Sequence, residues 1–262
     1  MIGVTKEVIN GKPLLHVANQ QHWTECLPTI FFIHGFTSAK EHNLHYAYLL
    51  AEEGFRVFLP DCLYHGERSA GFTEQELNFQ FWNIVIQTIH ELKEWKDVYV
   101  HKGFIDEERI GVAGTSMGGI VTLGALTQYD WIQAAVSLMG TPTYEQFAKM
   151  QMDYLKQKGI ELPLTKEEEE AFWDQIRKFD FSQQPEKWNK RPLMFWHGEK
   201  DDVVPYEPAF SFYEQLKAMG SSESLLKFIC DPSAGHKVTR EGVLQTVAWF
   251  QTHLLSTSVK VD

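Results

Sequence analysis

The sequence predicts an α/β fold, in which a mostly parallel sheet carries helices on both faces. Short apolar runs alternate with amphipathic segments along most of the chain, which is the pattern of repeated βα units. One of these runs, residues 109–113, leads directly into Gly114-Thr115-Ser116-Met117-Gly118, a G-x-S-x-G sequence typical of a sharp strand–turn–helix junction. At 262 residues the chain can bury a substantial core, so we expect one main domain.

A β-hairpin is predicted near the N-terminus, where residues 6–9 and 13–17 flank the turn dipeptide Asn10-Gly11. Residues 29–33 then form a continuous apolar run, as in a strand that is buried on both faces. Ser38 and Glu41 have the spacing of a capping box and predict a helix that ends near Gly54. Further strands are predicted at residues 56–59, 110–113, 134–138, 193–196 and 225–229.

Three more helices complete the alternation, because their apolar residues recur at helical spacing. They carry, in chain order, Phe79, Trp82, Ile86 and Ile89; residues 118–127; and Val243, Val247 and Phe250.

One segment interrupts the alternation. Residues 143–189 show two helical patterns and no strand pattern, so we predict a small helical cap, inserted into an α/β core of residues 1–142 and 190–262. The cap is rich in aromatic and methionine side chains, which suit an apolar acyl or alcohol group of a substrate. The same side chains would also be needed simply to dock the cap on the core. They are Phe147, Met150, Met152, Tyr154, Phe172 and Trp173.

Composition narrows the range of partners. The formal net charge is −11, from 24 basic and 35 acidic residues, which argues against a nucleic-acid partner. The N-terminal residues do not resemble a signal peptide, and no apolar window has the length of a membrane helix. The three cysteines are widely separated and are interpreted as reduced thiols. We therefore expect a cytoplasmic protein with no metal, no cofactor and no membrane partner, and the oligomeric state stays open.

Ser116 is a candidate nucleophile, because the turn lifts its hydroxyl above the sheet and aims the next backbone N–H at the atom under attack. A serine nucleophile needs a base to accept its proton and a third group to orient that base. His236 follows the last predicted strand and precedes the last helix, a position at the carboxyl edge of the sheet where ligands bind in open α/β folds. His253, within the last helix, is the alternative base.

Two loops at the same edge offer further candidates. Residues 197–205 follow a strand and present three carboxylates, Glu199, Asp201 and Asp202. Residues 61–68 follow the strand at 56–59, and either Tyr64 or His65 contacts substrate there, or the loop is merely stiffened by an Arg–carboxylate pair and a glycine.

These features resemble the α/β-hydrolase superfamily. The approach to the elbow, residues 105–119, is similar to that of small bacterial serine esterases near the branch of dienelactone hydrolases and the catalytic domains of prolyl oligopeptidases. Dienelactone hydrolases use a cysteine nucleophile where this chain has Ser116, so that activity is disfavoured. The chain also has no room for the propeller of prolyl oligopeptidases, so endopeptidase activity on large peptides is not implied.

The resemblance also implies roles for individual residues. The sequence from His197 to Pro205 is similar to the HG-x-x-D-x-x-V-P loop of these enzymes, which makes Asp201 the acid, with Asp202 and Glu199 as alternatives. The chain then contains Ser116, Asp201 and His236 in the family's order. The oxyanion-binding N–H groups would belong to Met117 and Phe36, and His34 would hold the loop around Phe36 in place. 

The implied reaction is hydrolysis of short- to medium-chain carboxylic esters through an acyl-enzyme on Ser116. A peptidase, amidase or thioesterase would use the same three residues, so these activities remain alternatives. An inactive binding protein with a hydrolase fold is a further alternative, but such proteins usually lack one of the three.

Overall fold

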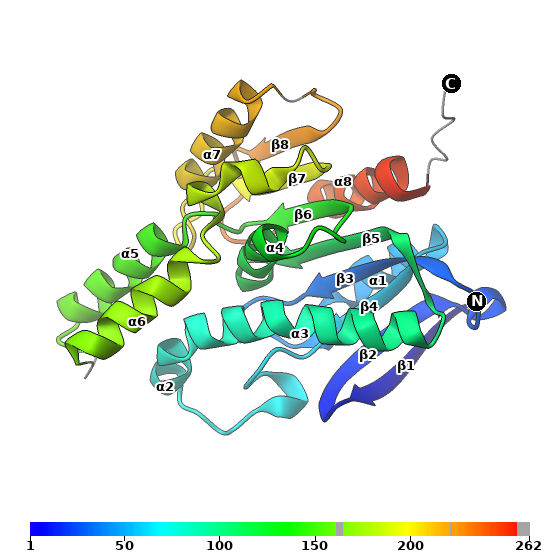
Figure 1. Cartoon of the computed structure of the whole chain (residues 1–262), viewed down its shortest axis with the longest axis horizontal. Coiled ribbons are helices and arrows are strands. Elements are labelled where there is room, and N and C mark those ends of the chain that lie inside the picture. Colours follow the sequence, from blue (N-terminus) through cyan, green and yellow to red (C-terminus); the bar gives the residue numbers. More distant parts are fainter. Residues whose placement is uncertain (161–164, 221, 256–262) are drawn as a thin grey trace.

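The computed structural model describes residues 1–160, 165–220 and 222–255 (Figure 1). One eight-stranded sheet runs through the molecule in the order β1-β2-β4-β3-β5-β6-β7-β8. Strand β2 pairs antiparallel with β1 and β4, and every other neighbouring pair is parallel, which confirms the predicted α/β fold. The strands are β1 (Ile2–Ile9), β2 (Lys12–Asn19), β3 (Leu27–Ile33), β4 (Arg56–Pro60), β5 (Ile105–Thr115), β6 (Ala134–Leu138), β7 (Leu193–Gly198) and β8 (Leu226–Asp231).

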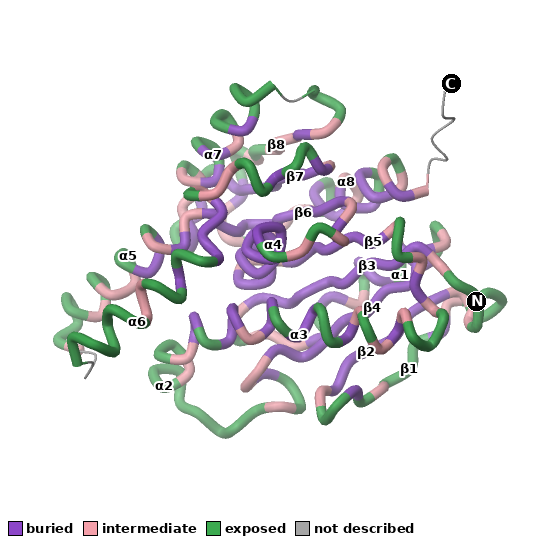
Figure 2. Tube along the Cα trace, in the orientation of Figure 1, coloured by how far each residue is buried: buried purple, intermediate pink, exposed green. Residues whose placement is uncertain are grey.

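Helices cover both faces of the sheet. Side chains of β3 alternate between the faces: Phe31 and Ile33 belong to one apolar cluster with α3, α4 and α7, while Ile30 and Phe32 belong to a second cluster with α1 and α8. The central strands are buried in consequence, as Figure 2 shows. The helices are α1 (Leu44–Glu52), α2 (Glu74–Phe79), α3 (Phe81–His101), α4 (Met117–Gln128), α5 (Tyr144–Gln157), α6 (Lys166–Arg177), α7 (Tyr206–Ala218) and α8 (Arg240–Phe250).

The predicted hairpin joins β1 to β2. Asn10 and Gly11 both have positive φ, 50° and 76°, the conformation that a two-residue turn between twisted strands requires. The hairpin adds two strands to one edge of the sheet, and β8 forms the other edge.

Two local predictions are wrong. The first turn after β3 is a 3-10 helix (Lys40–Asn43) whose N-cap, Ala39, makes no side-chain cap, while Ser38 Oγ lies 2.9 Å from His42 Nδ1 and forms no capping box. Phe79 does not belong to the long helix either, because the backbone turns at Gln80 and separates α2 from α3.

Between β6 and β7 the chain forms α5 and α6, which lie side by side and extend beyond the sheet (Figure 1). The aromatic side chain of Tyr144 anchors the start of α5, since it is buried and its hydroxyl donates to the carbonyl oxygen of Ile120 in α4 at 2.6 Å. Further along α5, Met150 and Tyr154 are exposed by 41% and 60%, so the far half of the helix has few buried contacts with the rest of the protein.

Candidate active site

Ser116 occupies the sharp turn between β5 and α4 that its G-x-S-x-G sequence predicted. Its φ of 54° and ψ of −116° lie in a region that non-glycine residues rarely adopt. The turn is tight because a Cβ on Gly118 would lie 2.1 Å from the carbonyl oxygen of Ile33, far inside van der Waals contact. Only glycine at this position lets α4 start directly against β3.

A continuous hydrogen-bonded line joins three of the predicted site residues. His236 Nε2 lies 2.8 Å from Ser116 Oγ, and His236 Nδ1 lies 2.7 Å and 2.9 Å from the two carboxylate oxygens of Asp201. Ser116 follows β5, Asp201 follows β7 and His236 follows β8, so all three stand at the carboxyl edge of the sheet. The arrangement has the geometry in which a histidine can take a serine proton while a carboxylate holds its ring.

Asp201 is fixed as an ionised, buried carboxylate. Burial alone would raise its pKa, but hydrogen bonds from His197, from His236 and from the backbone N–H of Val204 outweigh this and hold the pKa well below its usual value. The Val203 and Val204 N–H groups donate to Oδ1 at 3.0 Å and 2.9 Å, and His197 Nε2 lies 3.4 Å from Oδ2. The carboxylate therefore stays charged and pointed at His236 throughout the neutral pH range.

The loops that carry Asp201 and His236 are packed directly against each other. Glu199 N–H donates to the carbonyl oxygen of Asp231 at 2.9 Å, and Lys200 N–H donates to that of Ala234 at 3.0 Å. A Cβ at Gly198 would lie 2.4 Å from the carbonyl oxygen of Gly235, so this contact also depends on a glycine.

The loop after β3 lies against the serine. A Cβ built on Gly35 would lie 3.5 Å from Ser116 Cβ, which places the backbone of residues 34–37 beside the elbow. Met117 is the first residue of α4, and the N–H groups of a first helical turn have no acceptor within the helix. Phe36 and Met117, the two predicted oxyanion donors, thus belong to the loop beside Ser116 and to the first turn of the helix that follows it.

Two buried histidines hold the loop after β3 to the loop after β4. His34 Nε2 accepts from the N–H of Cys62 at 3.0 Å, and His65 Nε2 accepts from the N–H of Thr37 at 3.0 Å. Their Nδ1 atoms donate to the carbonyl oxygens of Gly35 and Leu63, so each ring is neutral. Burial is the main cause that lowers the pKa of His34 to about 4 and that of His65 below its usual value.

The substrate contact predicted for His65 is therefore wrong, since its side chain is buried and both ring nitrogens bond to backbone. Tyr64 packs edge-on against Phe72, with ring centroids 4.8 Å apart, and does not line the cavity that Ser116 borders. Of the alternative acids, Glu199 and Asp202 are exposed and do not contact His236.

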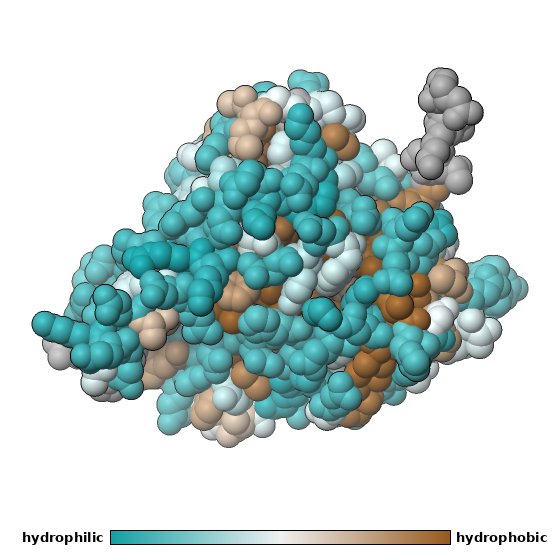
Figure 3. Space-filling view, in the orientation of Figure 1, coloured by the Kyte–Doolittle hydropathy of each residue, from teal (hydrophilic) through white to brown (hydrophobic). Residues whose placement is uncertain are grey.

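A cavity of about 560 Å³ opens beside Ser116, within the range of small-molecule sites. Its walls come from α2 and α3 on one side, from α5 and α6 on the other, and from the loop after β7. Most of the lining is apolar: Phe36, Phe79, Phe81, Trp82, Ile120, Phe147, Ala148, Met150, Met152, Tyr154, Leu155, Phe172, Val203 and Val204, together with Asn78, Gln151 and Asp202. Apolar side chains also reach the surface near α2 and beside the α5–α6 pair (Figure 3).

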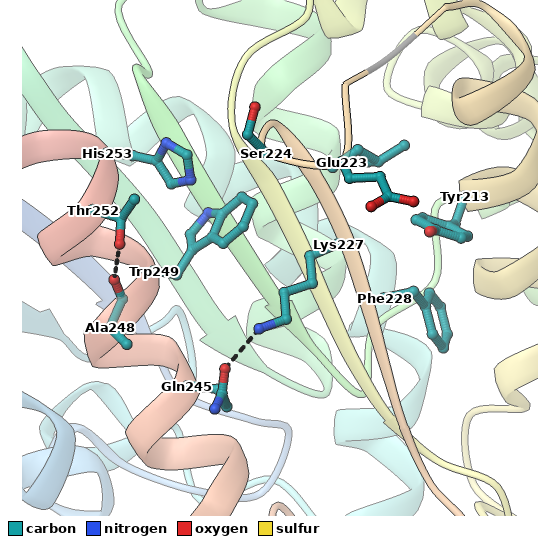
Figure 4. A pocket seen from close by; sticks show the side chains of 11 residues that line it. Tyr213, Glu223, Ser224, Lys227, Phe228, Gln245, Ala248, Trp249, Thr252 and His253 are labelled. Carbon is teal, nitrogen blue, oxygen red and sulfur yellow. Dashed lines mark hydrogen bonds between the residues drawn. The ribbon is translucent and has the colours of Figure 1, made fainter. Parts of the chain in front are cut away.

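The alternative base, His253, lies in a different groove. Figure 4 shows its ring beside Trp249, on the helical segment Gln251–Leu255 that follows α8. The two ring centroids are 4.2 Å apart, and the groove also borders the edge strand β8. The groove has a volume of about 500 Å³ and none of its lining residues borders the cavity at Ser116.

Within the described ranges no group of three or more His, Cys, Asp or Glu side chains is placed to hold a metal ion. None of the helices in these ranges has the length and hydrophobicity needed to span a bilayer.

Comparison with known proteins identifies the family. The prolyl oligopeptidase family matches residues 41–257, which is most of the chain. The chain belongs to this family. It is accordingly a serine hydrolase with the α/β-hydrolase fold, as the resemblance in the sequence implied.

Two relatives and one solved structure are similar to this chain over nearly its whole length. The chain is 49% identical to Bacillus subtilis YitV, whose name assigns it provisionally to the esterases, over 97% of this chain and 100% of that protein. It is 28% identical to the Escherichia coli esterase YjfP, again over 97% of this chain and 100% of that protein. The Pyrococcus horikoshii acylaminoacyl peptidase superposes with a TM-score of 0.72 at 19% identity, over 100% of this chain and 43% of that one, which shows the shared fold.

The sequence did not reveal the wall formed by α2 and the start of α3. Phe79, Trp82, Ile86 and Ile89 were predicted to share one face of a long helix, but Phe79 lies in α2 and the other three lie in α3. Phe79, Phe81 and Trp82 line the cavity from these two helices. No spacing signal marks the break at Gln80, because residues three positions apart share one face of a continuous helix. The sequence also did not reveal that His197 contacts Asp201.

Proposed function

We propose that this protein hydrolyses carboxylic esters with short- to medium-chain acyl groups, through a covalent acyl-enzyme on Ser116. The single observation that carries the proposal is the hydrogen-bonded line from Ser116 through His236 to Asp201, at the side of an apolar cavity. Two relatives whose names place them among the esterases, over nearly the full length of both chains, support the same reaction.

In the first half of the reaction, Ser116 Oγ attacks the acyl carbon while His236 Nε2 takes the hydroxyl proton. The oxygen of the tetrahedral intermediate receives hydrogen bonds from the N–H groups of Phe36 and Met117, donors of a kind that typically contribute about 3 kcal/mol each to the transition state. His236 then delivers the proton to the leaving alcohol, and the ester C–O bond breaks. Asp201 stabilises the imidazolium and fixes which nitrogen faces the serine.

In the second half, water replaces the alcohol. His236 takes a proton from the water as it attacks the acyl-enzyme, and returns that proton to Ser116 Oγ as the acid leaves. The α5–α6 pair serves as the cap of the site and supplies one apolar wall for the substrate, with residues 1–142 and 190–262 as the catalytic core.

Ser116→Ala tests the proposal directly. We expect hydrolysis of p-nitrophenyl butyrate to fall about 10⁴-fold or more, because no other group replaces the nucleophile. Ser211→Ala is the matched control, since Ser211 is exposed on α7 and lies outside the site. A fluorophosphonate probe should label the parent and the control but not Ser116→Ala. Undiminished hydrolysis by Ser116→Ala would contradict the mechanism.

Cleavage of aminoacyl amides is the second candidate, favoured by the family match and by the fold shared with an acylaminoacyl peptidase. Matched ester, thioester and amide substrates with one acyl group would separate the activities. The ester proposal requires the highest kcat/KM for the ester after correction for the intrinsic reactivity of each bond.

A further inference from the structure

A connected group of aromatic rings lines the cavity that Ser116 also borders. Phe36 and Phe81 pack edge to face with centroids 5.3 Å apart, and Phe81 and Trp82 do the same at 5.3 Å. Phe147 of α5 completes this group from the opposite side, 6.1 Å from Phe81. The aromatic faces carry partial negative charge, so such a lining attracts cations as well as apolar groups.

Asp202 adds a full negative charge to the same cavity. Of the described residues that line the cavity, it is the only one with a charged side chain. Its neighbour Asp201 is buried and fully engaged with His236, His197 and two backbone N–H groups. Asp202 by contrast is exposed, and among the described residues its carboxylate has no ion pair or hydrogen bond. It is therefore free to interact with a bound molecule.

We propose that this cavity selects esters that carry a positive charge, such as a quaternary ammonium group, over neutral esters of the same shape. This inference rests on the proposed ester hydrolysis. The aromatic rings desolvate the alkyl groups of an ammonium ion at little cost, and Asp202 supplies the opposite charge. Acyl or alcohol groups with phosphate or carboxylate would meet the same charge as a repulsion.

The position of Asp202 limits the size of the effect. Because its side chain is exposed, water and salt screen its charge, and the attraction to a bound cation is modest. We expect a preference of about tenfold for a cation, the combined result of one screened charge pair and one cation–π contact.

Two isosteric substrates measure this preference. Butyrylcholine carries a quaternary nitrogen where 3,3-dimethylbutyl butyrate carries a carbon, so the ratio of their kcat/KM values isolates the charge. We expect a ratio of about 10 in the parent protein and about 2 in Asp202→Asn, which removes the charge and keeps the shape. Glu199→Gln is the matched control, because Glu199 is an exposed carboxylate of the same loop that does not line the cavity, and the ratio should stay at its parent value.

Ionic strength provides a second measurement that needs no variant. Raising the salt concentration from about 20 mM to about 500 mM should lower the ratio in the parent several-fold, because the Debye length shrinks below the size of the site. A ratio near one in the parent, or an equal ratio in the parent and Asp202→Asn, would overturn the charge selection. The ester proposal itself is tested by Ser116-dependent hydrolysis of p-nitrophenyl butyrate, which carries no positive charge, so the two failures are distinguishable.

Discussion

The loops at the carboxyl edge of the sheet and the α5–α6 pair both border the cavity at Ser116, but they are held in different ways. Hydrogen bonds of two buried histidines join the loops after β3 and β4, and backbone hydrogen bonds join the loops after β7 and β8. In α5 and α6 the buried residues are few and lie at the end nearest the sheet, as Figure 2 shows.

The polar contacts of the two regions differ in the same way. The polar contacts of the α5–α6 pair include ion pairs at the surface, such as Glu145 with Arg177 and with Lys149, which contribute little because the basic side chains are solvated. Hydrogen bonds from Arg177 and Lys149 lower the pKa of Glu145 to about 2, so these pairs persist in mild acid. We therefore call the loops around Ser116 the rigid region and the α5–α6 pair the loosely attached region.

The largest loss of stability is expected from a substitution in the rigid region, at Gly118. In Gly118→Ala the new Cβ would lie 2.1 Å from the Ile33 carbonyl oxygen, a backbone atom that cannot move without shifting β3. We expect the free energy of unfolding to fall by more than about 4 kcal/mol, with loss of activity. Chemical denaturation monitored by circular dichroism measures the change.

Gly235→Ala is the control for this substitution. A Cβ at Gly235 would lie 3.5 Å from its nearest neighbour, the Lys200 carbonyl oxygen, which is ordinary contact. We expect the free energy of unfolding to change by less than about 1 kcal/mol, even though Gly235 is next to His236 in the sequence. Equal stability of the two variants would contradict the account of the elbow given above.

The same contrast explains which parts of the molecule were predictable. Glycine spacing, turn residues and apolar runs are local signals, and they indicated the strands along the chain, the elbow at Ser116 and the position of His236. Asp201 was chosen from three carboxylates of one loop only through the family resemblance. The shape of the cavity depends on the break between α2 and α3 at Gln80 and on the packing of α5 against α3. In that packing Gln151 Oε1 accepts a hydrogen bond from Trp82 Nε1 at 2.8 Å. Such contacts join residues 69 positions apart, and no local pattern encodes them.

Lowering the pH should reduce the free energy of unfolding through His34, a buried histidine of the rigid region. Its pKa is about 4 in the folded protein, mainly because of burial, and about 6.5 when unfolded. Between these values the unfolded chain binds a proton that the folded chain does not, so stability falls as the pH drops from 6.5 to 4. His34 should account for roughly 3 kcal/mol of that loss, and His16, whose pKa burial also lowers to about 4, should add a loss of similar size.

His34→Gln isolates this contribution. Urea denaturation at several pH values should give a smaller loss of stability from pH 6.5 to pH 4 in the variant than in the parent. The quantity compared is the slope of the free energy of unfolding against pH, not its absolute value. A variant that is less stable at every pH is therefore still informative. His22→Gln should keep the parent slope, because His22 is exposed in a surface pair with Glu25. An unchanged slope in His34→Gln would show that this ring is not the acid-sensitive group.

The smallest expected effect on stability comes from the loosely attached region. Tyr154→Ser removes a ring that is 60% exposed yet lines the cavity. We expect the free energy of unfolding to change by less than about 0.5 kcal/mol, and KM for p-nitrophenyl butyrate to rise about two- to fivefold with kcat nearly constant, because ground-state and transition-state contacts are lost equally. Tyr48→Ser is the control, since Tyr48 is 49% exposed on α1, across the sheet. A kcat reduced as strongly as KM is raised would mean that α5 helps to hold the reacting groups, and the separation between a rigid catalytic region and an adaptable wall would then be wrong.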